Sequence, residues 1–184
     1  MLSKVHPKGS FEIQVIKADG SVRKQFAEWS WASKLRKAGY ALPRIFGLTG
    51  RMSSRVLVGN LVTYAGLAGI AGRIGASGAP AAFDYIATGT GTNAASTGDT
   101  TLQTELAASG LTRAQGTVSL VTTSQTNDTA KCSKTFTVTD TVAVTECGLL
   151  NASSNGTLLG RNVFSAINVV NGDSLQIDYK VAVA

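Results

Sequence analysis

The chain has 184 residues and a formal net charge of +6, but only 15% of its residues are charged. This length suits one domain, or one domain with a small appendage. Low charge and an abundance of small residues, including 20 glycines, disfavour an ordinary soluble enzyme and are typical of a protein whose surface is largely covered by copies of itself or by partners.

Residues 1–75 are predicted to form a basic anchoring segment. No secretory signal is expected, because Met1–Lys8 has no apolar run after its charges, so the chain should fold in a reducing cytoplasm. A β-hairpin is predicted over 10–28, where apolar and polar residues alternate around an Asp19-Gly20 turn. An amphipathic helix is predicted to follow over 28–40, and a glycine-rich arm over 44–75.

Within this arm, Val56–Gly72 contains no charged residue. Its 17 residues are at the lower limit for a membrane span, and the Gly and Asn residues within it weaken a helix. We therefore expect a flexible arm that becomes ordered against a partner, with no membrane span. Residues 76–82, which contain Ser, Gly and Pro, are predicted to link this segment to the main domain.

Residues 83–184 are predicted to be mainly β. A strand begins at Tyr85, and Thr100 with Gln103 forms the pattern of a capping box, which predicts a short helix over 101–107. Five further strands are rich in Thr, Val, Ile and Phe and are separated by turn residues: 118–123, 130–138, 142–150, 157–167 and 175–183. Consecutive hairpins of this kind predict an antiparallel β-sandwich or small barrel with one short helix.

The two cysteines, Cys132 and Cys147, face each other if Thr139-Asp140 forms a two-residue hairpin turn. A cross-strand disulfide fits this register, but free thiols that serve as small apolar core residues are favoured. The spacing does not match a zinc site, and the chain has one histidine to contribute.

The positive charge is concentrated before residue 76. Residues 1–75 hold twelve Lys and Arg against three Asp and Glu, about +9, whereas residues 76–184 hold five against eight, about −3. This asymmetry predicts that the basic part contacts an acidic protein surface, a neighbouring subunit or nucleic acid, with a solvated face as the alternative. The candidate partner-docking residues are Lys34, Arg36, Lys37, Arg44, Arg51, Arg55 and Arg73.

No catalytic, cofactor-binding or metal-binding site is predicted, and the chain is not expected to be an enzyme. His6 lies near the N-terminus, so nucleophilic catalysis has no evident base. Most acids after residue 76 are explained by turns and caps, and only Glu105 and Glu146 are expected within regular elements. Gly89-Thr90-Gly91 lacks the ending of a phosphate-binding loop and is attributed to backbone freedom at the end of a strand.

Several motifs of the main domain resemble a module found in virion proteins of tailed bacteriophages. They are Tyr-Ile-Ala-x-Gly-Thr-Gly-Thr at 85–92, Asp-Thr-x-Leu-x-x-Glu at 99–105, Thr-Glu-Cys-Gly-Leu-Leu-Asn-Ala at 145–152, Gly-Thr-Leu-Leu-Gly-Arg at 156–161, Val-Phe-Ser at 163–165 and Gly-Asp-Ser-Leu-Gln-Ile at 172–177. The resemblance covers most of 83–184 and, more weakly, 10–40. Cys147 and the insert 44–75 lie outside the family pattern.

The resemblance implies a structural subunit of the virion that is made and assembled in the bacterial host cytoplasm. Such a subunit joins components at the tail, tail fibre or neck through oligomeric contacts, and a trimer is expected. A capsid decoration protein that stabilises the head shell is the alternative.

Two other classes of function make separate predictions. A carbohydrate- or receptor-binding module needs exposed aromatic residues on one face. A nucleic-acid-binding protein requires salt-dependent binding through residues 1–75, although that part lacks the interleaved aromatic and basic residues of known modules.

Overall fold

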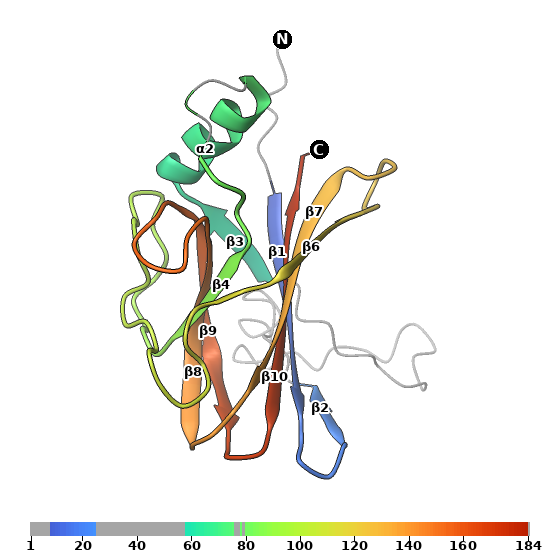
Figure 1. Cartoon of the computed structure of the whole chain (residues 1–184), viewed down its shortest axis with the longest axis vertical. Helices are drawn as coiled ribbons and strands as arrows, with labels where there is room; N and C mark the ends of the chain where they lie inside the picture. The colour runs from blue at the N-terminus through green and yellow to red at the C-terminus, as the bar shows by residue number, and fades with distance from the viewer. Residues whose placement is uncertain (1–7, 25–57, 76–77, 79, 184) are drawn as a thin grey trace, which may run out of the picture.

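The computed structural model describes residues 8–24, 58–75, 78 and 80–183. In this part of the chain, two antiparallel β-sheets are accompanied by a single short helix (Figure 1). The predicted mainly β, sandwich-like fold is therefore confirmed. The described strands do not close into a barrel, because β5 and β6, at the two ends of their order, are not paired with each other.

The two sheets take their strands from distant parts of the sequence. The first sheet has the order β2 (Val22–Lys24), β1 (Lys8–Ile16), β10 (Ser174–Ala182), β7 (Thr129–Thr137) and β6 (Thr117–Val121). The second has the order β5 (Ala114–Gln115), β4 (Tyr85–Gly89), β8 (Val142–Leu150) and β9 (Leu158–Val169). Strand β3 (Val58–Val62) links them, since its first residues pair with β1 and its last residues pair with β9.

The five strands predicted after residue 117 are present as β6 to β10, with bounds that differ by at most two residues. The described part of the N-terminal hairpin is also confirmed, because β1 pairs with β2 around Asp19-Gly20, and Gly20 has φ +80°. Strand β1 also pairs with β10 along its whole length, so the hairpin belongs to the sheet of the main domain. The predicted helix over 28–40 lies outside the described residues.

The described part of the predicted glycine-rich arm is regular structure rather than a flexible arm. After β3, Thr63 caps helix α2 (Tyr64–Gly75): its Oγ1 accepts a hydrogen bond from Gly66 N–H at 2.9 Å. A Cβ at Gly66 would collide with the carbonyl oxygen of Leu159 in β9. This glycine therefore allows the helix to lie directly on the sheet backbone, and the packing outweighs its poor helix propensity.

The core lies between the two sheets and follows the pleat. Along β10, Leu175, Ile177, Tyr179 and Val181 are buried and face inward, while the intervening polar residues are less buried. They form one apolar cluster with buried side chains of β1, β7, β8 and β9. A smaller cluster of Ala87, Leu102, Leu150 and Leu158 lies separate from it.

The predicted hairpin between 130–138 and 142–150 is wrong. Strand β7 pairs with β10 and β6, whereas β8 pairs with β4 and β9, so the chain crosses from one sheet to the other near Asp140. Cys132 and Cys147 consequently lie in different sheets and do not face each other across a ladder. Both are buried free thiols, as favoured from the sequence.

The predicted helix over 101–107 is also wrong. This segment is irregular and lies beside β4: Glu105 bridges Gly89, and Leu106 N–H donates to the carbonyl oxygen of Thr88 at 2.8 Å. Gln103 makes no capping box, because its side-chain oxygen accepts from Asn93 N–H at 2.8 Å. Tertiary hydrogen bonds replace those of a short helix that is marginal by itself.

Candidate functional site

A buried polar cluster is centred on Glu146 of β8. Its carboxylate, which is fully buried, accepts hydrogen bonds from the backbone N–H groups of Gly91, Gln103 and Thr104 at 3.0, 3.1 and 2.7 Å. Nε of Arg161 in β9 donates to the same carboxylate at 2.7 Å. Arg161 also donates to Asp99 at 2.9 Å. These contacts hold the segment 90–105 against β8 and β9.

The cluster is electrostatically satisfied. Burial disfavours the charged form of Glu146, but the Thr104 amide and the Arg161 guanidinium outweigh this and lower its pKa below 4.5. Burial likewise disfavours the charge on Arg161, but Glu146 and Asp99 outweigh it and raise the pKa of that guanidinium. The charged groups therefore compensate one another, and the chemical effect of the arrangement is to stabilise a loop.

Gly89 and Gly91 are explained by this carboxylate. A Cβ on either glycine would lie 2.5 Å from Oε1 of Glu146. Neither has a positive φ, so the backbone freedom inferred from the sequence is not the reason for these residues. The reason is the close approach of Glu146, which leaves no room for a side chain.

Glu105, the other acid expected within a regular element, lies at the bridge to β4. Its carboxylate forms an ion pair with Arg113 at 2.6 Å. Arg113 also donates to the carbonyl oxygens of Ala152 and Asn155, at 3.1 and 2.7 Å. Arg113, which is bound by Glu105, thus connects the segment before β5 to the loop between β8 and β9.

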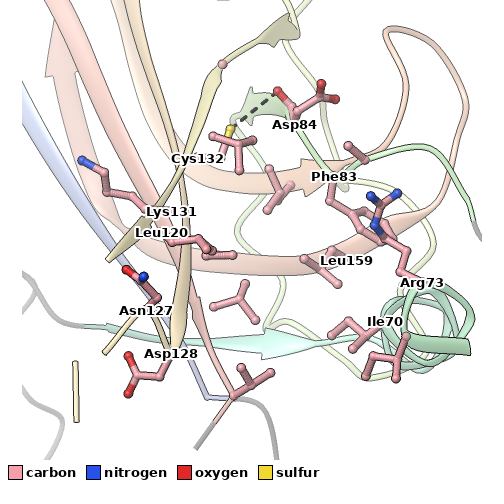
Figure 2. Close-up of a pocket in the computed structure, with 18 residues that line it drawn as sticks. Ile70, Arg73, Phe83, Asp84, Leu120, Asn127, Asp128, Lys131, Cys132 and Leu159 are labelled. Carbon is pink, nitrogen blue, oxygen red and sulfur yellow. Dashed lines mark hydrogen bonds between the residues drawn. The ribbon is translucent and has the colours of Figure 1, made fainter. Parts of the chain in front are cut away.

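An apolar pocket of about 750 Å³ opens between the two sheets beside α2 (Figure 2). Figure 2 shows Leu120 of β6 on one side of it and Ile70, Phe83 and Leu159 on the other. Cys132 forms part of its wall, where the thiol donates a hydrogen bond to the carbonyl oxygen of Asp84 at 3.5 Å. Burial, together with the charge of Asp84, raises the pKa of Cys132 to about 11, so this thiol is neutral at physiological pH.

Four large aliphatic side chains that line this pocket are exposed to solvent. The exposed fraction is 82% for Ile74, 61% for Leu120, 56% for Val183 and 49% for Val118. Val118 and Leu120 alternate with Ser119 along β6 and face the pocket, where the opposite sheet does not cover them. We call these four residues the apolar surface. It comes from α2, β6 and the end of the chain.

Of the seven predicted docking residues, Arg73 lies in the described part of the chain. It is an exposed residue of α2 that lines the pocket, and its Nη1 donates to the carbonyl oxygen of Pro80 at 2.8 Å. The other six, Lys34, Arg36, Lys37, Arg44, Arg51 and Arg55, lie outside the described residues.

Sequence reasoning placed a strand at β6 but did not identify its role at the pocket. The signal available was the composition of 114–127, which contains neither charge nor proline. Alternation of apolar and polar residues along a strand indicates that one face is apolar, but not which element covers that face. Whether the opposite sheet reaches far enough to cover that face depends on the packing of the two sheets.

No helix in the described part of the chain is long and apolar enough to cross a membrane. Comparison of the sequence and the structure with protein-family models, curated proteins and solved structures gives no match.

Proposed function

We propose that this protein is a non-enzymatic structural subunit of a tailed-bacteriophage particle, which joins virion proteins at the tail, tail fibre or neck. The observation that carries the proposal is the apolar surface formed by Ile74, Val118, Leu120 and Val183 around one pocket. Exposed apolar side chains gathered in this way mark a site of protein contact. Binding of a partner over these side chains removes them from water, and this burial of apolar surface favours the contact.

The placement of the motifs that resemble phage virion proteins supports the proposal. The motif at 85–92 forms β4 and its exit, and the motifs at 99–105 and 145–152 pack beside it. All three meet at Glu146, whose carboxylate binds Gly91, Gln103 and Thr104. The shared residues therefore act together to build one part of the fold, as expected for a family whose work is assembly.

The proposal is tested by quantifying the chain in phage particles purified from the host that encodes it. We expect the protein to co-purify with intact virions and to be located by antibody labelling at the tail, fibre or neck. A copy number that matches the symmetry of the tail supports this position. A copy number that scales with the capsid subunits supports the alternative, a decoration protein of the head. Absence from intact particles contradicts both.

The basic segment is proposed to anchor the subunit on an acidic neighbour. Deletion of residues 1–75 does not test this, because it removes β1 and β3 from the two sheets. Replacement of Lys34, Arg36 and Lys37 by Gln changes no residue of the described strands and should reduce incorporation into particles. The matched control replaces Lys134 of β7 and Lys180 of β10 by Gln, two lysines of the main domain that do not line the pocket. Equal incorporation of the two variants contradicts the anchor.

A further inference from the structure

Strand β6 is an open edge of the first sheet. In the described part of the chain, it pairs with β7 on one side and with no strand on the other. Edge strands of soluble proteins are normally protected by charged residues, proline or a covering element. Thr117–Val121 contains no charged residue or proline, the whole stretch 114–127 is uncharged, and no strand in the described part of the chain covers this edge. The unpaired backbone groups of this strand are therefore available to another strand.

We infer that β6 pairs with β6 of a second copy of this chain, in antiparallel register centred on Ser119, and that this contact covers the apolar surface. This inference rests on the proposed function and names the partner at its contact site. It extends the sheet β2-β1-β10-β7-β6 continuously from one copy into the next.

The register follows from symmetry and from the pleat of the strand. Two adjacent antiparallel strands are related by a two-fold axis perpendicular to the sheet, so the inner faces of both copies lie on the same side. Because side chains alternate, the axis must then pass through a pair of identical residues. A centre at Ser119 keeps all five residues of β6 paired. It sets Val118 opposite Leu120 of the second copy, on the pocket side.

The charge of the strand favours a second copy as the occupant. In a two-fold contact the same surface patch of both copies meets, so any net charge on the patch faces a like charge. Because the chain has a net charge of +6, it pairs with itself best through an uncharged patch. Strand β6 meets this condition, and Val118 with Leu120 forms apolar cross-strand pairs with the partner's equivalents. The neighbouring Lys131 faces Asp178 at 3.8 Å, so its charge is balanced within its own chain.

The size of the contact explains why the apolar surface extends beyond β6. A stable interface buries about 1,200–2,000 Å² in total, more than one pair of five-residue strands provides. Ile74 and Val183 line the same pocket as Leu120 and are exposed. Their burial adds the area that strand pairing lacks. The trimer expected from the sequence would require a different contact, in which two unlike surfaces meet.

The test measures the mass of the purified full-length chain by light scattering and sedimentation over a wide range of concentration. We expect twice the mass of one chain, with dissociation on dilution. Leu120→Lys should be monomeric where the unsubstituted protein is dimeric, since it places a charge on the pocket face of the edge. Val170→Lys, in the loop after β9, also replaces an exposed aliphatic residue with a charge and should remain dimeric.

The register is tested by cross-linking, which does not depend on a destabilised variant. Under oxidising conditions, Ser119→Cys should form a disulfide between two chains, because the two Ser119 positions face each other across the axis. Thr117→Cys should not, because it faces Val121 of the other chain. A dimer in which only Ser119→Cys is linked supports the inference.

A monomer at every concentration or a trimer overturns the inference. So does a dimer that persists in Leu120→Lys and is not cross-linked in Ser119→Cys. The outcome is separable from that of the proposed function. A monomer that is still found in virions removes only the β6 contact. A dimer that is absent from virions removes only the virion assignment.

Discussion

Arg161 Nε lies 2.7 Å from Oε2 of Glu146, and neither side chain is more than 3% exposed. A buried ion pair persists only where its remaining hydrogen-bonding capacity is satisfied. Here the Glu146 carboxylate accepts three further hydrogen bonds from backbone N–H groups, and the Arg161 guanidinium donates a further one to Asp99. The pair therefore ties the segment 90–105 to strands β8 and β9.

Replacement of Glu146 by Gln should lower the free energy of unfolding by about 3 kcal/mol, because it leaves Arg161 buried without its closest counter-charge. The measurement is urea unfolding followed by circular dichroism. Asp140→Asn is the control: it removes the same charge from an exposed turn residue and should change stability by less than about 0.5 kcal/mol. Equal effects of the two substitutions would contradict a structural role for the buried pair.

The contribution of Glu146 should also depend on pH. Folding lowers its pKa below 4.5, so the native state binds fewer protons than the unfolded chain around that pH. The stabilisation is therefore fully present above pH 4.5 and is lost as the pH falls through the lower pKa of the folded state. The difference in unfolding free energy between the unsubstituted protein and Glu146→Gln should shrink on acidification. A difference in unfolding free energy that grows towards low pH would contradict the lowered pKa of Glu146 in the folded state.

The contact of α2 with β9 predicts an unusual effect of alanine. Gly66→Ala should destabilise the protein by about 1–3 kcal/mol although alanine favours helices, because its Cβ collides with the carbonyl oxygen of Leu159. Gly75→Ala, at the open end of the same helix, has no atom within 4 Å of the added Cβ and should be neutral or slightly stabilising. Melting temperatures of the two variants compare them directly. A stabilised Gly66→Ala protein would mean that α2 does not lie on β9.

The apolar surface should contribute little to folding. Leu120 is 61% exposed, so Leu120→Ala should cost less than about 1 kcal/mol of unfolding free energy. Leu158 is fully buried, and Leu158→Ala should cost about 2–5 kcal/mol. Both are measured by urea unfolding at a concentration where the protein is monomeric. Similar losses would indicate that Leu120 belongs to the core rather than to a contact surface.

Both thiols should be unreactive in the folded protein. Burial and Asp84 raise the pKa of Cys132 to about 11, and burial also raises that of Cys147, so little thiolate exists at neutral pH. Alkylation by iodoacetamide should be slow in buffer and rapid in urea, as followed by intact mass. The variants Cys132→Ala and Cys147→Ala report on each thiol separately. Rapid labelling of native Cys147→Ala would show that solvent reaches Cys132 through the pocket.

Much of the fold was predictable because strands and turns have local signals. The strand at 142–150 has the predicted bounds, and the turns at Gly20 and Gly172 use glycines with positive φ, as their sequences indicate. The pairing of β7 with β8 was predicted wrongly, because a short turn at Asp140 is compatible both with a hairpin and with a crossing between sheets. The choice depends on β10, which pairs with β7 although the paired residues are 37 (Ser174 and Thr137) to 53 (Ala182 and Thr129) positions apart in sequence.

The site was less predictable than the fold. The sequence predicts Glu146 as a rare acid within a strand, but the groups that bind its carboxylate come from the segment 90–105 and from β9. The helix expected over 101–107 failed for the same reason, since Gln103 and Thr104 donate their N–H groups to Glu146. Strand β6 was identified, but not as an edge, because only the strand order shows which strand lacks a second neighbour.

By itself the sequence determined where strands β6 to β10 lie and that glycine and asparagine mark turns between them, and it favoured core positions for both thiols. These features depend on alternation and backbone preference, which act over a few residues. Only the tertiary structure decided which strands pair, why Gly66 and Gly91 must lack a side chain, and that the pocket face of β6 remains uncovered. These depend on the contact of segments far apart in the chain, where the fit of one surface to another outweighs local propensity.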